Sequence, residues 1–551
     1  MTASDPAVAE PSTEPSTEWT GASVDAPAPA GRPDHSALQS LKNIVTNYGA
    51  LFVLSVSNIL LTPILLTALG PVDYGMLRLT SSMIGYMGLF DLGVSTSIIY
   101  FVARYHSTGE RQALDRYVTT VFNAVSLLAV VVIAVCAVAA PAFATFLGVP
   151  PDSLATGTAV VRLSSLWFTA HLLGGVFGGV LIGRGRFDVN NLISIAYSLA
   201  TFLGTFALIR LGYGLIAVVL LNVVTAAAGA AGRATAAGTM HLVRVAIGRV
   251  SGAVLRSSIG YGFWSFLNNV AGTLSFAATD MVVLARVLGV SGVSVYAVAV
   301  APVALVAEFV FQSVDVFQPV ITNQTYRRDR AGGESGGVAS VGPSFLLLMK
   351  TSVLLGWGPT LLVWLAGRQV LALWVGEIGV VAGDLMIALS FAFGWNYIGH
   401  AAGLVLLGTA KHQMLGAVAL VGAILNVALS YIFTVHFGLL GVAFGTSVVM
   451  GVTEMIILPV YTCRLVGLPL RKYVDLIVRA AVCLPVAYGA GLAAGVATAG
   501  LLGVWGATAV ECLVGGALFL ASFWFVILAG GERDLLLRVV RDILRRRGSA
   551  R

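Results

Sequence analysis

Long apolar segments follow one another from residue 44 almost to the end of the chain, and they decide what it can fold into. Two of them, residues 48–69 and 76–102, each exceed the roughly 20 residues that a helix needs to cross a bilayer. Since 58% of the 551 residues are hydrophobic and only 10% are charged, the composition excludes a soluble globular domain. The chain is therefore predicted to be an all-α, polytopic membrane protein.

About fourteen transmembrane helices are predicted from these segments. The connections on the outer side are short, so no extramembrane catalytic domain is expected. The predicted spans are residues 44–69, 76–102, 117–147, 154–182, 189–211, 213–236, 257–285, 294–323, 344–366, 379–407, 413–436, 439–463, 474–499 and 503–529.

Polar segments divide this series of helices into parts. Residues 1–40 contain six acidic residues and almost nothing apolar, which predicts a disordered cytoplasmic tail. The basic C-terminal end fits either an amphipathic helix on the anionic inner leaflet or a solvated tail. The predicted divisions after the tail are an N-terminal lobe of six helices at 41–240, a basic cytoplasmic linker at 241–256, a C-terminal lobe of six helices at 257–465, two further helices at 466–529, and a basic amphipathic cytoplasmic tail at 530–551.

The basic residues predict the orientation of the chain in the membrane. With the N-terminus inside, all but five of the 32 lysines and arginines fall in segments that face the cytoplasm. This bias is the positive-inside signal, and it places both termini in the cytoplasm. The exceptions are Arg78, Arg162, Arg210, Arg286 and Arg368.

Two passages of the first half recur in the second half. Leu69-Gly70 is matched by Leu288-Gly289 at an offset of 219 residues, and residues 181–186 are matched by 406–411 at an offset of 225. Because six is an even number, two six-helix lobes would share one orientation and be related by a pseudo-twofold axis along the membrane normal. Repeats of this kind bind their substrate between the lobes, near the bilayer midplane.

Polar residues in the first two spans indicate a pathway through the membrane. Asp91 lies near the middle of its span, where a carboxylate costs on the order of 3 kcal/mol and normally faces a bundle interior or a wet cavity. Asn47 and Asn58 are eleven residues apart, which is about 20° apart around a helix. Arg78 has a planar fork that suits a diphosphate, although an arginine near the outer face also reaches lipid headgroups. One face of this hairpin is therefore predicted to line a cavity.

The span at 294–323 carries a second polar stripe. Glu308, Gln312 and Asp315 lie at positions i, i+4 and i+7, which share one face of a helix. Two carboxylates on one intramembrane stripe favour proton or cation coupling. The alternative is that they are structural and form hydrogen bonds between helices.

The span at 257–285 supplies the remaining candidates. Asn268 and Asn269 lie on the segment that corresponds to the first span, so they are predicted to bind substrate in one cleft with Asn47 and Asn58. Amides that join neighbouring helices are an equally good interpretation. Asp280 either contributes to the cavity and ion coupling or pairs with Arg286 at the outer end of the helix.

Several function classes are excluded by what the sequence lacks. It has no GxxxxGK[ST] loop and no soluble domain, so nucleotide hydrolysis and enzymatic activity are not expected. It has four scattered cysteines without a CxxC pair, which predicts no metal and no other cofactor. It also has no basic run with interleaved aromatic residues, so nucleic acid is not an expected partner.

The motifs Leu69–Gly75, Leu89-Phe90-Asp91-Leu92-Gly93 and Ala103-Arg104-Tyr105 resemble the opening of the polysaccharide transporter (Wzx-like) family. Thr279-Asp280, Leu288-Gly289 and Pro319 extend the resemblance into the second half. This family belongs to the superfamily of multidrug, oligosaccharidyl-lipid and polysaccharide exporters. Lipid II flippases of the superfamily carry arginines in the first helix, whereas this chain has Asn47 and Asn58 there.

The resemblance implies two lobes around a cavity that opens alternately to either side of a bacterial cytoplasmic membrane. It implies a flippase that moves polyprenyl-diphosphate-linked oligosaccharide, a surface-polysaccharide precursor, from the inner to the outer leaflet. The expected partners are that lipid-linked glycan and membrane lipids, with glycan polymerases or glycosyltransferases as further candidates. The alternatives are a cation-coupled exporter of drugs or other small molecules and a non-transporting scaffold of a glycan assembly complex.

Overall fold

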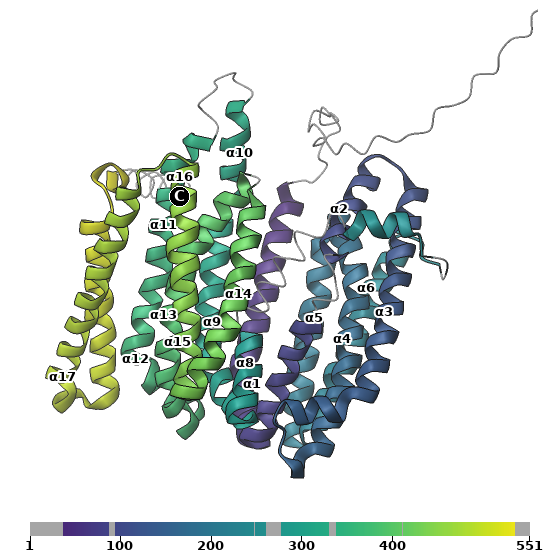
Figure 1. Ribbon diagram of the computed structural model, residues 1–551, viewed down its shortest axis with the longest axis horizontal. Coiled ribbons are helices and arrows are strands. Elements are labelled where there is room, and N and C mark those ends of the chain that lie inside the picture. The colour runs from purple at the N-terminus through teal and green to yellow at the C-terminus, as the bar shows by residue number, and fades with distance from the viewer. Residues whose placement is uncertain are drawn as a thin grey trace, which may run out of the picture.

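The computed structural model describes residues 37–87, 94–246, 248, 250–259, 277–329, 338–409 and 411–534. All regular elements in this part of the chain are helices, and most of them run side by side in one direction or its reverse (Figure 1). The first half of the chain lies on one side of the molecule and the second half on the other. The all-α membrane fold predicted from the apolar segments is therefore confirmed.

The helices of the first half begin within the predicted tail, since the first of them starts at Ala37. The preceding residues lie outside the described part of the chain. The helices are α1 (Ala37–Met87), α2 (Val94–Ser107), α3 (Arg111–Phe146), α4 (Leu154–Gly183), α5 (Phe187–Arg210) and α6 (Leu215–Thr239).

The second half contains more and shorter elements, in part because π-helical turns interrupt two of its helices and end a third. These turns are η4 (Val353–Trp357), η5 (Gly451–Ile457) and η6 (Phe523–Ile527). The α-helices are α8 (Ala277–Leu288), α9 (Val290–Asp315), α10 (Gln318–Asp329), α11 (Gly342–Ser352), α12 (Gly358–Val375), α13 (Glu377–Gly408), α14 (His412–Phe437), α15 (Leu439–Met450), α16 (Leu458–Leu465) and α17 (Leu470–Ser522).

Two glycines reverse the direction of the chain inside α1 and α17. Gly70 has φ 77° and Gly503 has φ 67°, a left-handed backbone that glycine adopts without the steric cost of a Cβ. The sequence predicts a turn at residues 70–75, but only Gly70 leaves the helical conformation. The helix resumes at Pro71 because proline fits the first turn of a helix, where its missing N–H is not needed.

Eleven helices among the described residues are long and apolar enough to cross a membrane. One of them, Leu470–Ile527, has 58 residues and turns back at Gly503. Residues 88–93 and 260–276 belong to predicted spans and lie outside the described residues. The number of fourteen spans, the domain boundaries and the pseudo-twofold relation therefore stay predictions.

The predicted continuous helix at 294–323 is interrupted. The α9 helix ends at Asp315, and α10 begins at Gln318 after a two-residue turn. Pro319 explains the position of this break, because proline has no N–H to continue the helical hydrogen bonds and crowds the turn before it. Asp315 thus lies at a helix end rather than within a helix.

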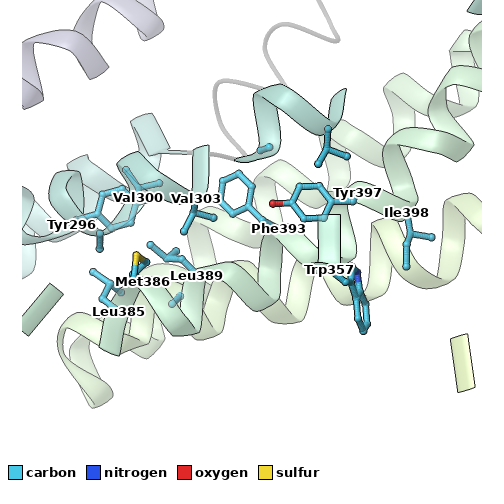
Figure 2. Packing of buried hydrophobic residues seen from close by; sticks show 14 of the residues in the cluster. Tyr296, Val300, Val303, Trp357, Leu385, Met386, Leu389, Phe393, Tyr397 and Ile398 are labelled. Atoms are coloured by element: carbon cyan, nitrogen blue, oxygen red, sulfur yellow. The ribbon is translucent and has the colours of Figure 1, made fainter. Parts of the chain in front are cut away.

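The core of the second half forms where α9 packs against α13. Figure 2 shows Val300 and Val303 of α9 beside Met386 and Leu389 of α13, and all four side chains are buried. Trp357 of η4 donates a hydrogen bond from Nε1 to the backbone oxygen of Gly394 at 2.9 Å. These contacts give α13 a fixed position at the centre of the second half.

The α1 helix joins the two halves, since it packs against α5 of the first and α9 of the second. At the end of the molecule where Gly70 turns the chain, a Cβ on Gly75 would overlap the backbone oxygen of Val290. Ser294 donates a hydrogen bond to the backbone oxygen of Pro71 at the same place. The halves are therefore in close contact at the end opposite Ala37 and Asp534 (Figure 1).

Candidate functional site

A cavity of about 400 Å³ lies between the two halves, and we call it the central cavity. The first half supplies the polar residues Ser55, Asn58, Thr62 and Arg78 from the two legs of α1. The second half supplies Glu308 from α9. The remaining wall is mostly apolar and comes from α1, α8 and α9. Polar groups of both halves thus meet at one site within the membrane-spanning helices.

A side pocket of about 180 Å³ continues from this site into the first half. It shares Asn58 and Arg78 with the central cavity, and α4, α5 and α6 form its other walls. Trp167, Tyr197 and Asn222 contribute aromatic rings and an amide to this side pocket. Such groups stack on and form hydrogen bonds with the rings and hydroxyls of a sugar.

Arg78 is held in place by two hydroxyl groups of its own helix pair. Its Nε donates to the Tyr74 hydroxyl at 2.8 Å, and its Nη2 donates to the Thr62 hydroxyl at 3.0 Å. Both partners are almost fully buried, whereas Arg78 itself is half-buried. Among the described residues, Nη1 has no hydrogen-bond partner and the guanidinium has no carboxylate partner. The side chain is therefore a positioned cation with donors left for an anionic ligand.

Glu308 lies on the opposite wall of the central cavity. Its side chain is exposed, and its Oε1 accepts a hydrogen bond from Nε2 of Gln312 at 3.0 Å. This i, i+4 contact follows from helical spacing and confirms that Glu308 and Gln312 share a face. Glu308 and Arg78 line the same cavity from different halves and form no ion pair with each other.

Asp315 does not line the central cavity, and its contact is of the interhelical kind that the structural alternative predicts. Its carboxylate contacts Nε2 of His400 at 2.8 Å. Both residues line a different cavity, about 390 Å³, inside the second half. The physical reason is that α9 ends at Asp315, which lies beside His400 of α13 instead of the gap between the halves.

Asp280 is fully buried and has hydroxyl partners from three other places in the chain. It accepts hydrogen bonds from Tyr296 at 2.8 Å, from Thr446 at 3.2 Å and from Ser430 at 3.4 Å. The predicted pairing with Arg286 is wrong, because Arg286 is exposed and is not among these partners. The hydroxyl donors balance the carboxylate in place of an arginine.

The amide predictions are only partly placed by the structure. Asn58 lines the central cavity, and its Nδ2 donates to the backbone oxygen of Leu54 at 3.1 Å. Asn47 belongs to α1. Asp91, Asn268 and Asn269 lie outside the described residues, so their roles stay predictions.

Little in the sequence indicates which groups form hydrogen bonds with Arg78 and Asp280. Tyr74 stands four residues before Arg78, and this spacing alone is a weak signal for their contact. Thr62 and Thr446 are hydroxyl residues in largely apolar runs, where such residues usually bond to their own backbone. The packing of the two legs of α1 brings Thr62 to Arg78, and the packing of α15 near α8 brings Thr446 to Asp280.

The site as a whole has the chemistry of a binding site for an anionic, hydroxyl-rich group. Arg78 supplies a charged fork, Asn58 an amide, and the side pocket aromatic and amide groups. Within the described residues, no group of three or more histidine, cysteine, aspartate or glutamate side chains is arranged to hold a metal ion.

This chain is similar in sequence to a known protein family and to a bacterial membrane protein. A model of the polysaccharide biosynthesis protein family matches residues 40–324. The uncharacterized membrane protein EpsK of Bacillus subtilis (strain 168) is 24% identical over 425 residues, which are 76% of this chain and 82% of that protein.

Solved structures of exporters and flippases have a similar fold. The lipid II flippase MurJ in an inward closed conformation superposes with a TM-score of 0.68 at 14% identity, covering 91% of this chain and all of that one. An inward-facing multidrug transporter of the MATE family superposes with a TM-score of 0.66 at 16% identity, covering 77% of this chain and 98% of that one.

Proposed function

Because this chain belongs to the polysaccharide biosynthesis protein family, we propose that it flips a polyprenyl-diphosphate-linked oligosaccharide. The lipid-linked glycan, a surface-polysaccharide precursor, moves from the inner to the outer leaflet of a bacterial cytoplasmic membrane. The chain acts as a transporter and not as an enzyme. Its described ends lie at one end of the helix bundle, and we assign that end to the cytoplasm from the positive-inside bias.

The observation that carries the proposal is the central cavity, where Arg78 and Asn58 of the first half face Glu308 of the second. A diphosphate has several oxygens in the geometry that a guanidinium fork binds. Arg78 is anchored by Tyr74 and Thr62, so its orientation does not have to be fixed by the ligand. This preorganisation lowers the entropic cost of binding.

The side pocket gives the oligosaccharide a place next to the diphosphate. Since Arg78 lines both spaces, a ligand whose phosphates contact Arg78 positions its first sugar beside Trp167 and Tyr197. The lipid tail has no need of a polar cavity and remains in the hydrocarbon. The arrangement therefore suits an amphiphile with an anionic junction better than a compact soluble molecule.

Transport requires the cavity to open to each side in turn. The two halves touch at Gly75 and Val290 at the outer end, so in the structure they are joined there. The bound headgroup drives the cycle only if it stabilises the two arrangements differently. Arg78 and Glu308 are placed to do this, because they lie on different halves and their separation changes when the halves move.

A cation-coupled exporter of small molecules is the second candidate. The likeness to a multidrug transporter and the exposed Glu308 carboxylate favour it, since carboxylates in such cavities bind organic cations or protons. A glycan-assembly scaffold without transport activity would leave the polar lining of the cavity without a purpose.

The deciding experiment uses the full chain in vesicles that contain a fluorescent polyprenyl-diphosphate-linked glycan. Flipping is read as the fraction of glycan that becomes accessible to an impermeant quencher on the opposite side. We expect the protein to accelerate this transfer above that of empty vesicles. Transport of cationic dyes without any transfer of the glycan would instead support the exporter.

A further inference from the structure

Three basic side chains lie together at the cytoplasmic end of the first half, away from the central cavity. They are His106 near the end of α2, Arg111 at the start of α3 and Arg184 directly after α4. Arg184 donates from Nη1 to Nδ1 of His106 at 2.6 Å. Burial and the nearby Arg111 guanidinium both lower the pKa of Arg184. We call these three residues the basic cluster.

The basic cluster is positioned by the packing of the segments that carry it. A Cβ on Gly183 would come within 2.9 Å of the backbone oxygen of Ile99, so the end of α4 that precedes Arg184 lies directly on α2. Arg111 donates from Nη2 to the backbone oxygen of His241 at 2.7 Å. This bond ties Arg111 to the segment that follows α6 and leads to the second half.

Neutral groups accept the hydrogen bonds of both arginines. Arg184 bonds to an imidazole and Arg111 to a backbone carbonyl, and neither forms an ion pair with a carboxylate among the described residues. Asp115, one turn along α3 from Arg111, instead accepts a hydrogen bond from the backbone N–H of Arg244 at 2.8 Å. Arginine stays charged at physiological pH. The basic cluster therefore holds two neighbouring positive charges that repel each other and have N–H donors left over.

The basic cluster lies at the level of the lipid headgroups. The stretch of α4 that can cross the membrane ends at Gly183, and that of α3 begins at Arg111. Tyr100 of the neighbouring α2 is 41% exposed, and the Tyr105 ring stacks on Phe101 with centroids 6.1 Å apart. Tyrosine is enriched where a membrane protein passes from hydrocarbon to water. The inner leaflet is therefore the nearest source of a ligand.

We propose that the basic cluster binds the phosphate of an anionic phospholipid of the inner leaflet, such as phosphatidylglycerol. Guanidinium groups present N–H donors in the geometry that phosphate oxygens accept. Since Nδ1 of His106 accepts from Arg184, the imidazole proton is on Nε2 and is a further donor. A zwitterionic lipid fits less well, because its own ammonium adds another positive charge. Basic pockets between transmembrane helices on the cytoplasmic side are a recurring type of site for anionic headgroups.

A lipid bound here joins several segments of the first half. It contacts the end of α2, the start of α3 and the turn after α4, and through Arg111 it acts on the segment that begins at His241. Its negative charge removes the repulsion between Arg111 and Arg184. The lipid thus takes the place that a carboxylate has in an internal ion pair. The proposal does not depend on which solute the chain carries.

The test titrates the purified full-length protein in detergent with dioleoyl phosphatidylglycerol and counts the bound lipids by native mass spectrometry. The informative variants are Arg184→Gln and Arg111→Gln. Glutamine keeps an N–H donor for His106 or His241 but removes the positive charge. A hydrogen bond to a charged group at a partly exposed site corresponds to about a tenfold change in affinity. We therefore expect each variant to bind the most tightly held phosphatidylglycerol about tenfold more weakly.

Arg116→Gln is the matched control. Arg116 is an exposed arginine in the same part of α3, and five residues place it about 140° around the helix from Arg111. Its replacement removes the same charge, so it lowers any general attraction to anionic lipid equally. We expect Arg116→Gln to bind phosphatidylglycerol as the parent chain does. If Arg184→Gln does not give monodisperse protein, Arg111→Gln decides.

Competition separates the possible sources of phosphate. We expect neither inorganic phosphate nor dioleoyl phosphatidylcholine to displace phosphatidylglycerol from the parent chain. Displacement by inorganic phosphate would mean that the site takes a free anion, and displacement by the polyprenyl-diphosphate-linked glycan would assign the cluster to the transported solute. Either result would overturn the proposal. So would the absence of saturable binding by the parent chain, unchanged binding in both cluster variants, or an equal loss in Arg116→Gln.

Discussion

Replacement of Arg78 tests the central cavity most sharply, because the structure separates the atoms that anchor this side chain from those that face the cavity. Nε and Nη2 donate to Tyr74 and Thr62, and the other donors have no partner among the described residues. Arg78→Ala removes the cation and the fork. Arg78→Lys keeps the charge but cannot make both anchoring contacts and a bidentate contact with a phosphate.

The size of the effect follows from these contacts. A hydrogen bond to a charged group contributes about 1.5–3 kcal/mol. Since Arg78 is half-buried and partly screened, the lower end of that range applies, or about 3 kcal/mol for a bidentate pair. Each 1.4 kcal/mol is a factor of ten, so Arg78→Ala weakens the apparent affinity for the lipid-linked glycan by about 100-fold and Arg78→Lys by about 10-fold.

The assay is glycan flipping in vesicles as a function of glycan concentration, with protein insertion measured in each preparation. Arg162→Ala is the control, because Arg162 is exposed and donates from Nε to the backbone oxygen of Ala137, away from the cavity. It should behave as the parent chain. Unchanged affinity in Arg78→Ala, or an equal loss in Arg162→Ala, would refute the role given to Arg78.

Three further changes follow from contacts elsewhere. Gly75→Ala overpacks the contact with Val290 and should lower the free energy of unfolding by about 1–3 kcal/mol. We expect a lower unfolding midpoint and slower flipping. An unchanged midpoint would contradict the tight contact. Burial and the Arg184 guanidinium lower the pKa of His106 from its ordinary value of 6.5. The unfolded chain therefore binds the proton more readily, and the stability of the folded chain falls as the pH drops below about 6.5. Thermal unfolding should show this loss of stability at low pH, and His106→Gln should reduce the loss. The buried ammonium of Lys350 lies 2.6 Å from the Glu532 carboxylate, so Glu532→Gln leaves it without an anion and should lower the free energy of unfolding by about 1–3 kcal/mol. The double variant with Lys350→Met should recover part of this loss. Equal unfolding midpoints for the single and double variants would contradict the ion pair.

The apolar runs predict the helical membrane fold because the bilayer leaves a chain few other ways to satisfy its backbone. Hydrophobicity does not reveal local breaks. The turn at residues 316–317 interrupts an apolar segment that reads as continuous, and the decisive residue is Pro319 next to it. In contrast, the reversal at Gly70 falls in the predicted turn, since Gly-Pro is a strong local signal.

The site was predictable where charge or amide groups stand in apolar runs, and less so where packing decides. Asn58, Arg78 and Glu308 are conspicuous in sequence, and the structure brings them to one cavity. Asp315 is equally conspicuous, but it lies at the end of α9, where its carboxylate contacts His400. Helical spacing relates residues within one helix, and it carries no information on which other helix lies opposite.

The most direct test of the account places a photoreactive amino acid in the wall of the central cavity. Ala304 lines this cavity, whereas Leu513 on α17 is 71% exposed on the outer surface of the bundle. In vesicles with a polyprenyl-diphosphate-linked glycan, we expect a cross-link to the glycan from position 304, weakened by Arg78→Ala, and little or none from position 513. Equal capture at the two positions, or no capture at 304 while flipping proceeds, would contradict passage of the glycan between the halves.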